Sequence, residues 1–193
     1  MEGKLEGLKL QNKFKTIFDV DKPVIAMVHL GALPGTPLFD SSTGIDGIVK
    51  NALADLEALQ DARVDAIMFG NENDRPYQLE VDTASTATSA YVIGKLSKHI
   101  KVPFGVNMLW DPMATIALGA ATGADFVREI FTGSYASDMG CWNPNAGEAV
   151  RYRDSLGRSD MLLLYNISAE FAYSLDRRPL PDRARSAVFS SIP

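Results

Sequence analysis

Five short apolar runs recur along the chain, and each is followed by a segment whose apolar residues repeat at helical spacing. The runs are continuous rather than alternating, a pattern typical of strands buried on both faces, as in parallel sheets. They cover residues 24–28, 65–69, 102–109, 125–131 and 161–167. The helical segments cover residues 45–59, 84–100, 112–122, 147–156 and 182–191. The pattern therefore predicts five consecutive strand–helix units.

Local signals agree with the ends of these units. Asp111 can cap a helix whose first position is Pro112, and Gly123 suits the residue just after it. Ahead of the first strand, residues 1–20 carry scattered apolar side chains among polar ones. We expect this N-terminal segment to form an amphipathic helix or arm that covers one end of the core.

Alternating strands and helices predict right-handed βαβ units, a parallel sheet and the α/β class. Two arrangements fit the periodicity. One is an open, doubly wound sheet of five strands; the other is a partial (β/α)8 TIM-type barrel, whose complete form needs about 250 residues and eight units. Both describe a single domain, with the arm at residues 1–20 and the five units at residues 21–193.

Composition excludes several classes of protein. The 193 residues are 46% hydrophobic and 22% charged, which is typical of a globular chain. A net charge of −5 argues against a nucleic-acid partner, which would need clustered Lys and Arg. No apolar run is long enough to span a membrane, the N-terminus lacks a signal-peptide core, and the single Cys141 fits a reducing compartment. We expect a cytoplasmic protein with peripheral membrane association at most.

Polar residues gather after the predicted strands. Ligands bind at the carboxyl ends of the strands in both candidate folds, so these residues are expected to share one site. The expected catalytic residues are His29, Glu72 and Glu170, and the expected substrate-binding residues are Asn71, Asn107, Arg128, Glu129, Asp138 and Asn166.

The roles follow from side-chain chemistry. His29 is the candidate acid or base, because imidazoles exchange protons near neutral pH. Glu72 and Glu170 are candidates for a second acid or base, or for orienting a ligand. Arg128 lies inside an apolar strand, where it either pairs with Glu72 or Glu129 or binds an anionic ligand. The asparagines can position a ligand or cap loops.

Cofactor signals are weak. Glu72, Asp74, Glu129 and Asp138 could supply oxygen ligands, but no close-set ligand motif supports a metal site, and none is predicted. The Gly/Pro-rich segment at residues 31–37 matches neither a phosphate-binding loop nor a dinucleotide fingerprint, so it reads as a shaped substrate loop. The cofactor, if any, is unknown.

The loop after the first strand carries a more specific pattern. Met27-Val-His-Leu-Gly-Ala-Leu-Pro-Gly-Thr-Pro37 resembles the opening of the BtpA/SgcQ family. The similarity continues through Val102–Asn107, Gly123–Arg128, Thr132–Gly133, Ser137–Gly140, Arg151–Arg153 and Asn166–Tyr173, so it covers nearly the whole chain.

The resemblance implies a TIM-type barrel grouped with ribulose-phosphate-binding barrels, which favours the barrel over the open sheet. The family takes its name from a cyanobacterial factor needed for photosystem I accumulation, and other members lie among sugar-metabolism genes. It implies no established reaction. Two hypotheses follow: an enzyme or enzyme remnant that binds a small anionic metabolite, such as a sugar phosphate, or a non-catalytic biogenesis or assembly factor for a membrane complex such as photosystem I.

The chain departs from the family in one respect. Family members continue through further strands, whereas this sequence stops before the expected sixth strand, which reads as a C-terminal truncation. Phosphate sites in such barrels commonly involve the loops after strands seven and eight. Five strands also leave two sheet edges unpaired. We therefore expect a homo-oligomer or a complementing chain that associates through those edges.

Overall fold

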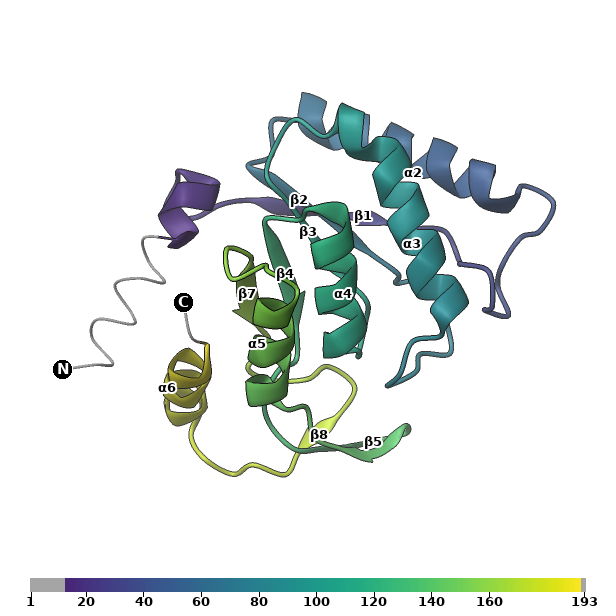
Figure 1. Cartoon of the computed structure of the whole chain (residues 1–193). Helices are drawn as coiled ribbons and strands as arrows, with labels where there is room; N and C mark the ends of the chain where they lie inside the picture. The colour runs from purple at the N-terminus through teal and green to yellow at the C-terminus, as the bar shows by residue number, and fades with distance from the viewer. Residues whose placement is uncertain (1–12, 192–193) are drawn as a thin grey trace.

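A parallel sheet of five strands forms the centre of the structure, a computed structural model that describes residues 13–191 (Figure 1). Its strands are β1 (Ile25–His29), β2 (Ala66–Gly70), β3 (Phe104–Asn107), β4 (Phe126–Glu129) and β7 (Leu162–Tyr165). They follow one another in chain order, β1-β2-β3-β4-β7, and every neighbouring pair is parallel. This order confirms the partial TIM-type barrel, because the strands of a doubly wound sheet do not follow chain order throughout. In that fold the strand order reverses at a switch point.

Four helices cover one face of this sheet (Figure 1). They are α2 (Gly44–Asp61), α3 (Thr83–Leu96), α4 (Pro112–Thr122) and α5 (Ala146–Ser155), and a 3-10 turn, Ser97–His99, follows α3. Asp111 caps α4 as expected, since its carboxylate accepts hydrogen bonds from the Met113 and Ala114 N–H groups. The main core lies between these helices and the sheet, with Val28, Leu56, Phe69, Val106 and Val127 among its buried residues.

Residues 13–18 are helical and pack on the opposite face of the sheet. The Phe18 ring lies 4.6 Å from the Phe14 ring and 5.2 Å from the Phe126 ring, measured between centroids. Met68, Leu162 and Phe126 complete this second core. The described part of the arm therefore covers the inner face of the barrel wall, while residues 1–12 of the expected arm lie outside the described residues.

The strand register sorts the inner face into rows. Met27, Met68, Gly105, Phe126 and Leu162 stand opposite one another across the five strands and form the first row. Since side chains alternate along a strand, the row two residues further on points to the same face. That second row contains His29, Gly70, Asn107, Arg128 and Leu164. It is the last row before the carboxyl ends of the strands.

The segment at residues 132–145, between β4 and α5, contains a hairpin. β5 (Tyr135–Ser137) pairs with β6 (Gly140–Trp142), and β8 (Tyr173–Ser174) joins on the other side of β5, all antiparallel. Tyr135 and Trp142 are opposite one another and their rings stack with centroids 4.6 Å apart. Aromatic cross-strand pairs of this kind stabilise short hairpins. Strands of two or three residues are too short to produce a periodic signal.

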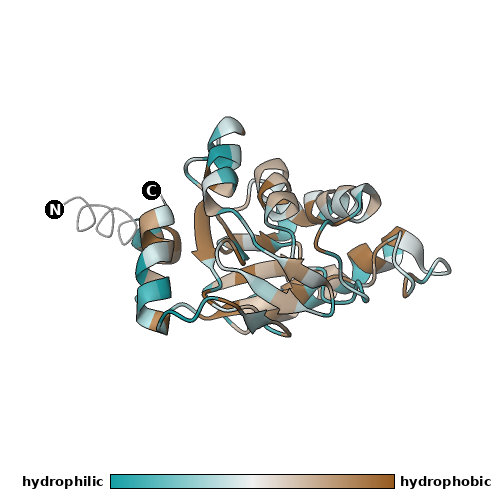
Figure 2. Ribbon diagram, turned by 90° about the horizontal axis from the view of Figure 1, so that it is seen from below, coloured by the Kyte–Doolittle hydropathy of each residue, from teal (hydrophilic) through white to brown (hydrophobic). Residues whose placement is uncertain are grey.

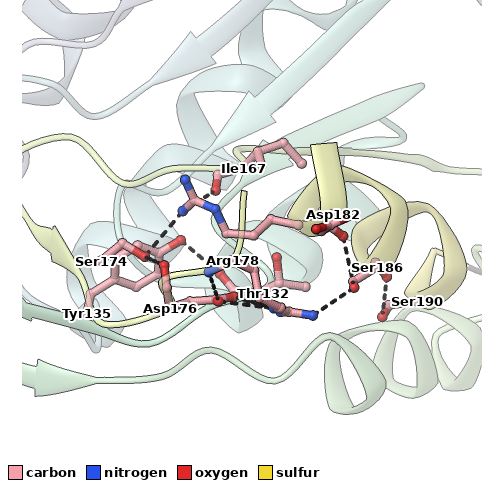
Figure 3. A network of polar contacts seen from close by, with 10 residues as sticks. Thr132, Tyr135, Ile167, Ser174, Asp176, Arg178, Asp182, Ser186 and Ser190 are labelled. Atoms are coloured by element: carbon pink, nitrogen blue, oxygen red, sulfur yellow. Dashed lines mark hydrogen bonds and ion pairs between the residues drawn. The ribbon is translucent and has the colours of Figure 1, made fainter. Parts of the chain in front are cut away.

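The C-terminal helix, α6 (Leu180–Ser190), lies apart from the other four and mixes hydrophilic with hydrophobic residues (Figures 1 and 2). A polar network joins it to β8 (Figure 3). Arg178 binds the Asp176 carboxylate and donates to the Ser186 hydroxyl at 3.0 Å. The hydrogen bonds that the Arg178 side chain and backbone N–H donate to Asp176 lower the pKa of this carboxyl to about 2. Arg183 donates to the Ser174 hydroxyl at 3.2 Å, so both arginines anchor the start of the helix.

β1 and β7 are the edges of the central sheet in the part of the chain that the structure describes. An apolar groove of about 480 Å³ lies along β7, between Phe14 of the arm and Ala184, Ala187 and Val188 of α6. Val188 is 45% exposed. An edge strand with apolar neighbours favours association with another chain.

We predict that the chain associates through this edge. Val188→Glu, which puts a charge into the apolar groove, is expected to shift the protein towards a monomer. Leu156→Glu is the control, because Leu156 is similarly exposed, at 40%, but follows α5. Size-exclusion chromatography with light scattering measures both. A wild-type chain that is monomeric at all accessible concentrations would contradict the prediction.

Candidate functional site

The carboxyl ends of the strands carry a cavity of about 580 Å³. Its walls come from the loops after four strands. The residues that line it are Glu72, Asn73, Arg75 and Tyr77 after β2, Trp110 after β3, Ser137, Asp138 and Met139 in the β5–β6 hairpin, and Phe171 after β7. Ligand pockets commonly combine apolar and aromatic walls with a few polar groups, and this cavity has both.

Trp110 forms a buried part of the cavity wall and is 6% exposed. Its indole meets the Trp142 ring edge-on, with centroids 5.5 Å apart, and Trp142 in turn stacks on Tyr135. The Trp142 indole N–H donates to the Ser137 hydroxyl at 3.2 Å. The hairpin is therefore attached to the end of β3 through aromatic contacts.

Glu129 contacts the backbone of Trp110 and is 2% exposed. Its Oε2 accepts hydrogen bonds from the Asn107 Nδ2 group at 2.5 Å and from the Trp110 backbone N–H at 3.2 Å. Its Oε1 accepts from the Ile130 N–H at 2.8 Å. Burial disfavours the charged carboxylate and raises the pKa of Glu129 to about 7, although these three hydrogen bonds act in the opposite direction. Glu129 can therefore exchange a proton near neutral pH.

Asn107 is 1% exposed and connects two strands at the same level. In addition to the Glu129 carboxylate, its Nδ2 group donates to the Arg128 carbonyl at 2.7 Å. Both acceptors belong to β4, while Asn107 ends β3. The amide therefore fixes the register of the two strands where the site begins.

Arg128 stands in the second inner row and is half-buried. Among the described residues, Arg128 forms neither of the two ion pairs considered for it, with Glu72 or Glu129, and its buried Nε atom has no hydrogen-bond partner. A buried guanidinium donor without a partner is costly unless another group satisfies it. The Nε–H group of Arg128 can therefore donate a hydrogen bond to an anionic partner.

The comparisons with known proteins agree with this architecture. A sequence profile described as "BtpA family" matches residues 20–193, which include all five strand–helix units. The chain belongs to the BtpA family.

The individual relatives of this BtpA-family chain are described in different terms. It is 47% identical over 179 residues to the sgc region protein SgcQ of Escherichia coli K12, which covers 93% of the chain and 67% of SgcQ. It is 30% identical over 161 residues to the photosystem I biogenesis protein BtpA of Synechocystis, which covers 82% of the chain and 55% of that protein. An uncharacterized protein of Archaeoglobus fulgidus is 31% identical over 137 residues, covering 69% of the chain and 54% of the relative.

The chain therefore spans about two thirds of SgcQ and about half of these other two relatives. No solved structure matches the sequence. None of the helices within residues 13–191 has the length and apolar character needed to cross a membrane.

Asn71 braces the loops around the site. Its Nδ2 group donates to the Asp74 carboxylate at 3.1 Å, and its Oδ1 atom accepts from the Leu109 N–H at 2.8 Å. The other oxygen of Asp74 accepts from the Leu33 N–H at 2.8 Å, and burial raises the pKa of Asp74. These bonds hold the loop at residues 31–37 against the ends of β2 and β3. Asn71 and Asp74 also line a smaller cavity of about 200 Å³.

The remaining predicted residues occupy different positions at the strand ends. Glu72 is exposed, lines the larger cavity and accepts a hydrogen bond from the Tyr77 hydroxyl at 3.1 Å. Asp138 is exposed at the turn of the hairpin and lines the same cavity. His29 is exposed at the end of β1, in the same row as Asn107 and Arg128.

Asn166 and Glu170 follow β7. The backbone N–H of Asn166 donates to the Glu129 carbonyl at 2.9 Å, and its side chain is half-buried. Glu170 is exposed. Neither residue lines the larger cavity, and neither does His29. The lining also omits four other predicted site residues, namely Asn71, Asn107, Arg128 and Glu129. Among residues 13–191, no three His, Cys, Asp or Glu side chains are grouped closely enough to hold a metal ion.

Sequence reasoning missed the aromatic walls of the cavity. Tyr77, Trp110 and Phe171 all follow a strand of the central sheet, and Phe171 is 81% exposed. The predicted site residues were all polar. Aromatic residues directly after strands, such as Trp110 between β3 and the Asp111 cap, were the available signal.

Proposed function

We propose that this face binds a small anionic metabolite, with a sugar phosphate as the best-fitting class. The observation that carries the proposal is the cavity at the carboxyl ends of the strands, which has aromatic walls beside polar groups. Aromatic faces pack against the C–H groups of a sugar ring, while Asn73, Glu72 and Asp138 can bind hydroxyl groups. Arg128 stands in the second inner row and does not line this cavity, but its Nε has no hydrogen-bond partner among the described residues. It is the proposed partner for the negative charge.

The proposed chemistry is proton transfer. His29 would act as acid or base at the end of β1, and Glu72 and Glu170 would supply a second acid or base or orient the ligand. Of these three, Glu72 lines the cavity, so a ligand that reaches His29 or Glu170 extends beyond it. Asn71, Asn107, Glu129 and Asn166 would hold the strand ends and loops in place around the ligand. The relatives SgcQ and BtpA are longer than this chain. The reaction of a complete family member is therefore also a proposal.

Tryptophan fluorescence tests the binding directly. The chain has two tryptophans, and both belong to this site: Trp110 lines the cavity and Trp142 packs on it. We expect ribose 5-phosphate to change the fluorescence saturably, at lower concentrations than either ribose or inorganic phosphate. Arg128→Met should weaken binding by roughly 10-fold to 100-fold, because a hydrogen bond to a charged group contributes about 1.5–3 kcal/mol.

Arg151→Met is the matched control, since Arg151 is an exposed arginine on α5. It should leave the affinity unchanged. Equal losses in both variants would show that general charge, rather than Arg128, attracts the ligand. No response to any pentose or hexose phosphate would refute the sugar-phosphate proposal.

The exposed apolar surface of α6 favours a second function, that of a non-catalytic assembly factor. Leu180, Val188 and Phe189 of α6 are 54%, 45% and 75% exposed, an apolar surface that suits a protein partner. The Synechocystis relative is described as a photosystem I biogenesis protein. A non-catalytic assembly factor would use such a surface and would not need the cavity, so variants of α6 and of Arg128 separate the two functions.

A further inference from the structure

Trp110 has a backbone conformation that is rare for a bulky residue. Its φ is +72°, in the left-handed region that normally favours glycine. Backbone strain of this kind persists only where the surroundings enforce it, and it is concentrated at functional sites. The question is which contacts keep Trp110 in this conformation.

Carboxylates hold the backbone on both sides of the strained residue. The Trp110 N–H donates to the Glu129 carboxylate at 3.2 Å. The next residue, Asp111, caps α4 and also accepts a hydrogen bond from the Val81 N–H at 2.9 Å. Asp111 is therefore fixed by the helix that follows it, and its N–H donates to the Met108 carbonyl at 3.1 Å, which closes a turn around Leu109 and Trp110. Within this turn, the Trp110 N–H is held by the buried Glu129 carboxylate.

We propose that the Glu129 carboxylate is a positioning group for Trp110, so that a proton on Glu129 releases the indole from the cavity wall. Three donors converge on this carboxylate, from Asn107, Trp110 and Ile130. A protonated carboxyl carries no charge and accepts hydrogen bonds less strongly than a carboxylate, so protonation weakens the hold on the Trp110 N–H. The strained peptide at Trp110 is then free to relax towards an ordinary conformation.

The surroundings make this proton exchange accessible near neutrality. Burial raises the pKa of Glu129 to about 7, and the positive charge of Arg128 acts in the opposite direction. Other titratable or charged groups nearby are Glu72, Arg75 and Asp138, which line the cavity beside Trp110, and His29, which shares a row with Asn107. These residues supply the controls.

The inference goes beyond the proposed function, since it concerns Trp110 in the protein without ligand. If the cavity binds a metabolite, the affinity should fall as the pH drops below about 7, because the aromatic wall moves. A chain that binds the ligand can lack the pH-dependent change at Trp110, and a chain that shows this change can fail to bind the ligand. The two measurements therefore test the two proposals separately.

The test uses the full chain with Trp142→Phe, which leaves Trp110 as the single tryptophan. Its emission is recorded from about pH 5 to about pH 9, a range that brackets neutral titrations. We expect one transition with a midpoint near 7 and emission shifted to longer wavelength on the acid side. Adding Glu129→Gln should abolish the transition, while His29→Gln and Glu72→Gln should preserve it.

A second variant covers the case in which Glu129→Gln does not fold. Arg128→Met removes the charge that lowers the pKa of Glu129, so the midpoint should move to higher pH. The proposal is overturned by a flat profile in the Trp142→Phe chain, by a transition that survives Glu129→Gln, or by one that disappears with His29→Gln.

Discussion

Gly105→Ala is expected to lower the free energy of unfolding by about 3 kcal/mol. Gly105 lies in the first inner row next to Phe126. A methyl group added there would overlap the Phe126 ring and lie 2.5 Å from its Cδ2 atom. That ring is fully buried and packs on Phe18, so it has little room to move.

Gly94→Ala is the matched control. Gly94 lies within α3, and a Cβ atom added there would meet nothing within 4 Å. Alanine should therefore raise stability by about 0.5–1 kcal/mol, because it restricts the unfolded chain and favours the helix. Urea denaturation followed by circular dichroism measures both variants. If Gly105→Ala unfolded at the wild-type urea concentration, residues 13–18 would not be packed on this face as described.

The second large effect concerns pH. Between about pH 4.5 and about pH 7 the native chain keeps a proton on Glu129 that the unfolded chain has released, because burial raises the pKa from 4.5 to about 7. Stability should therefore fall as the pH rises through this window. The contribution of Glu129 is on the order of 3 kcal/mol, since one pKa unit corresponds to about 1.4 kcal/mol.

Urea denaturation at a series of pH values measures this slope. Glu129→Gln removes the titrating group and should flatten the dependence in this window, at some cost in stability because an amide offers one acceptor oxygen to three donors. Glu170→Gln changes an exposed glutamate in the same way and should keep the wild-type slope. Identical slopes in all three proteins would show that Glu129 is ionised throughout the window.

The sequence pattern was sufficient to place the strands and helices of the central sheet along the chain. Continuous apolar runs, helical stripes and the Asp111–Pro112 start are local properties, and the strands and helices lie where these signals predict them. The choice of a barrel wall over an open sheet came from the family resemblance, because strand order depends on how units pack and not on their periodicity. The short hairpin at β5 and β6 escaped prediction because cross-strand aromatic pairing, rather than a repeating pattern, stabilises it.

The candidate site, like the fold, could be predicted only in part from the sequence. That polar residues would follow the strands could be predicted, since parallel strands end at one face of a barrel. Which of them meet was decided by tertiary structure. Glu129 faces Asn107 and the Trp110 N–H only because β3 and β4 are neighbours, and its titration near neutrality results from burial by residues distant in sequence. Periodicity reports which face a side chain occupies, but burial, strain and pairing arise only when separate segments pack together.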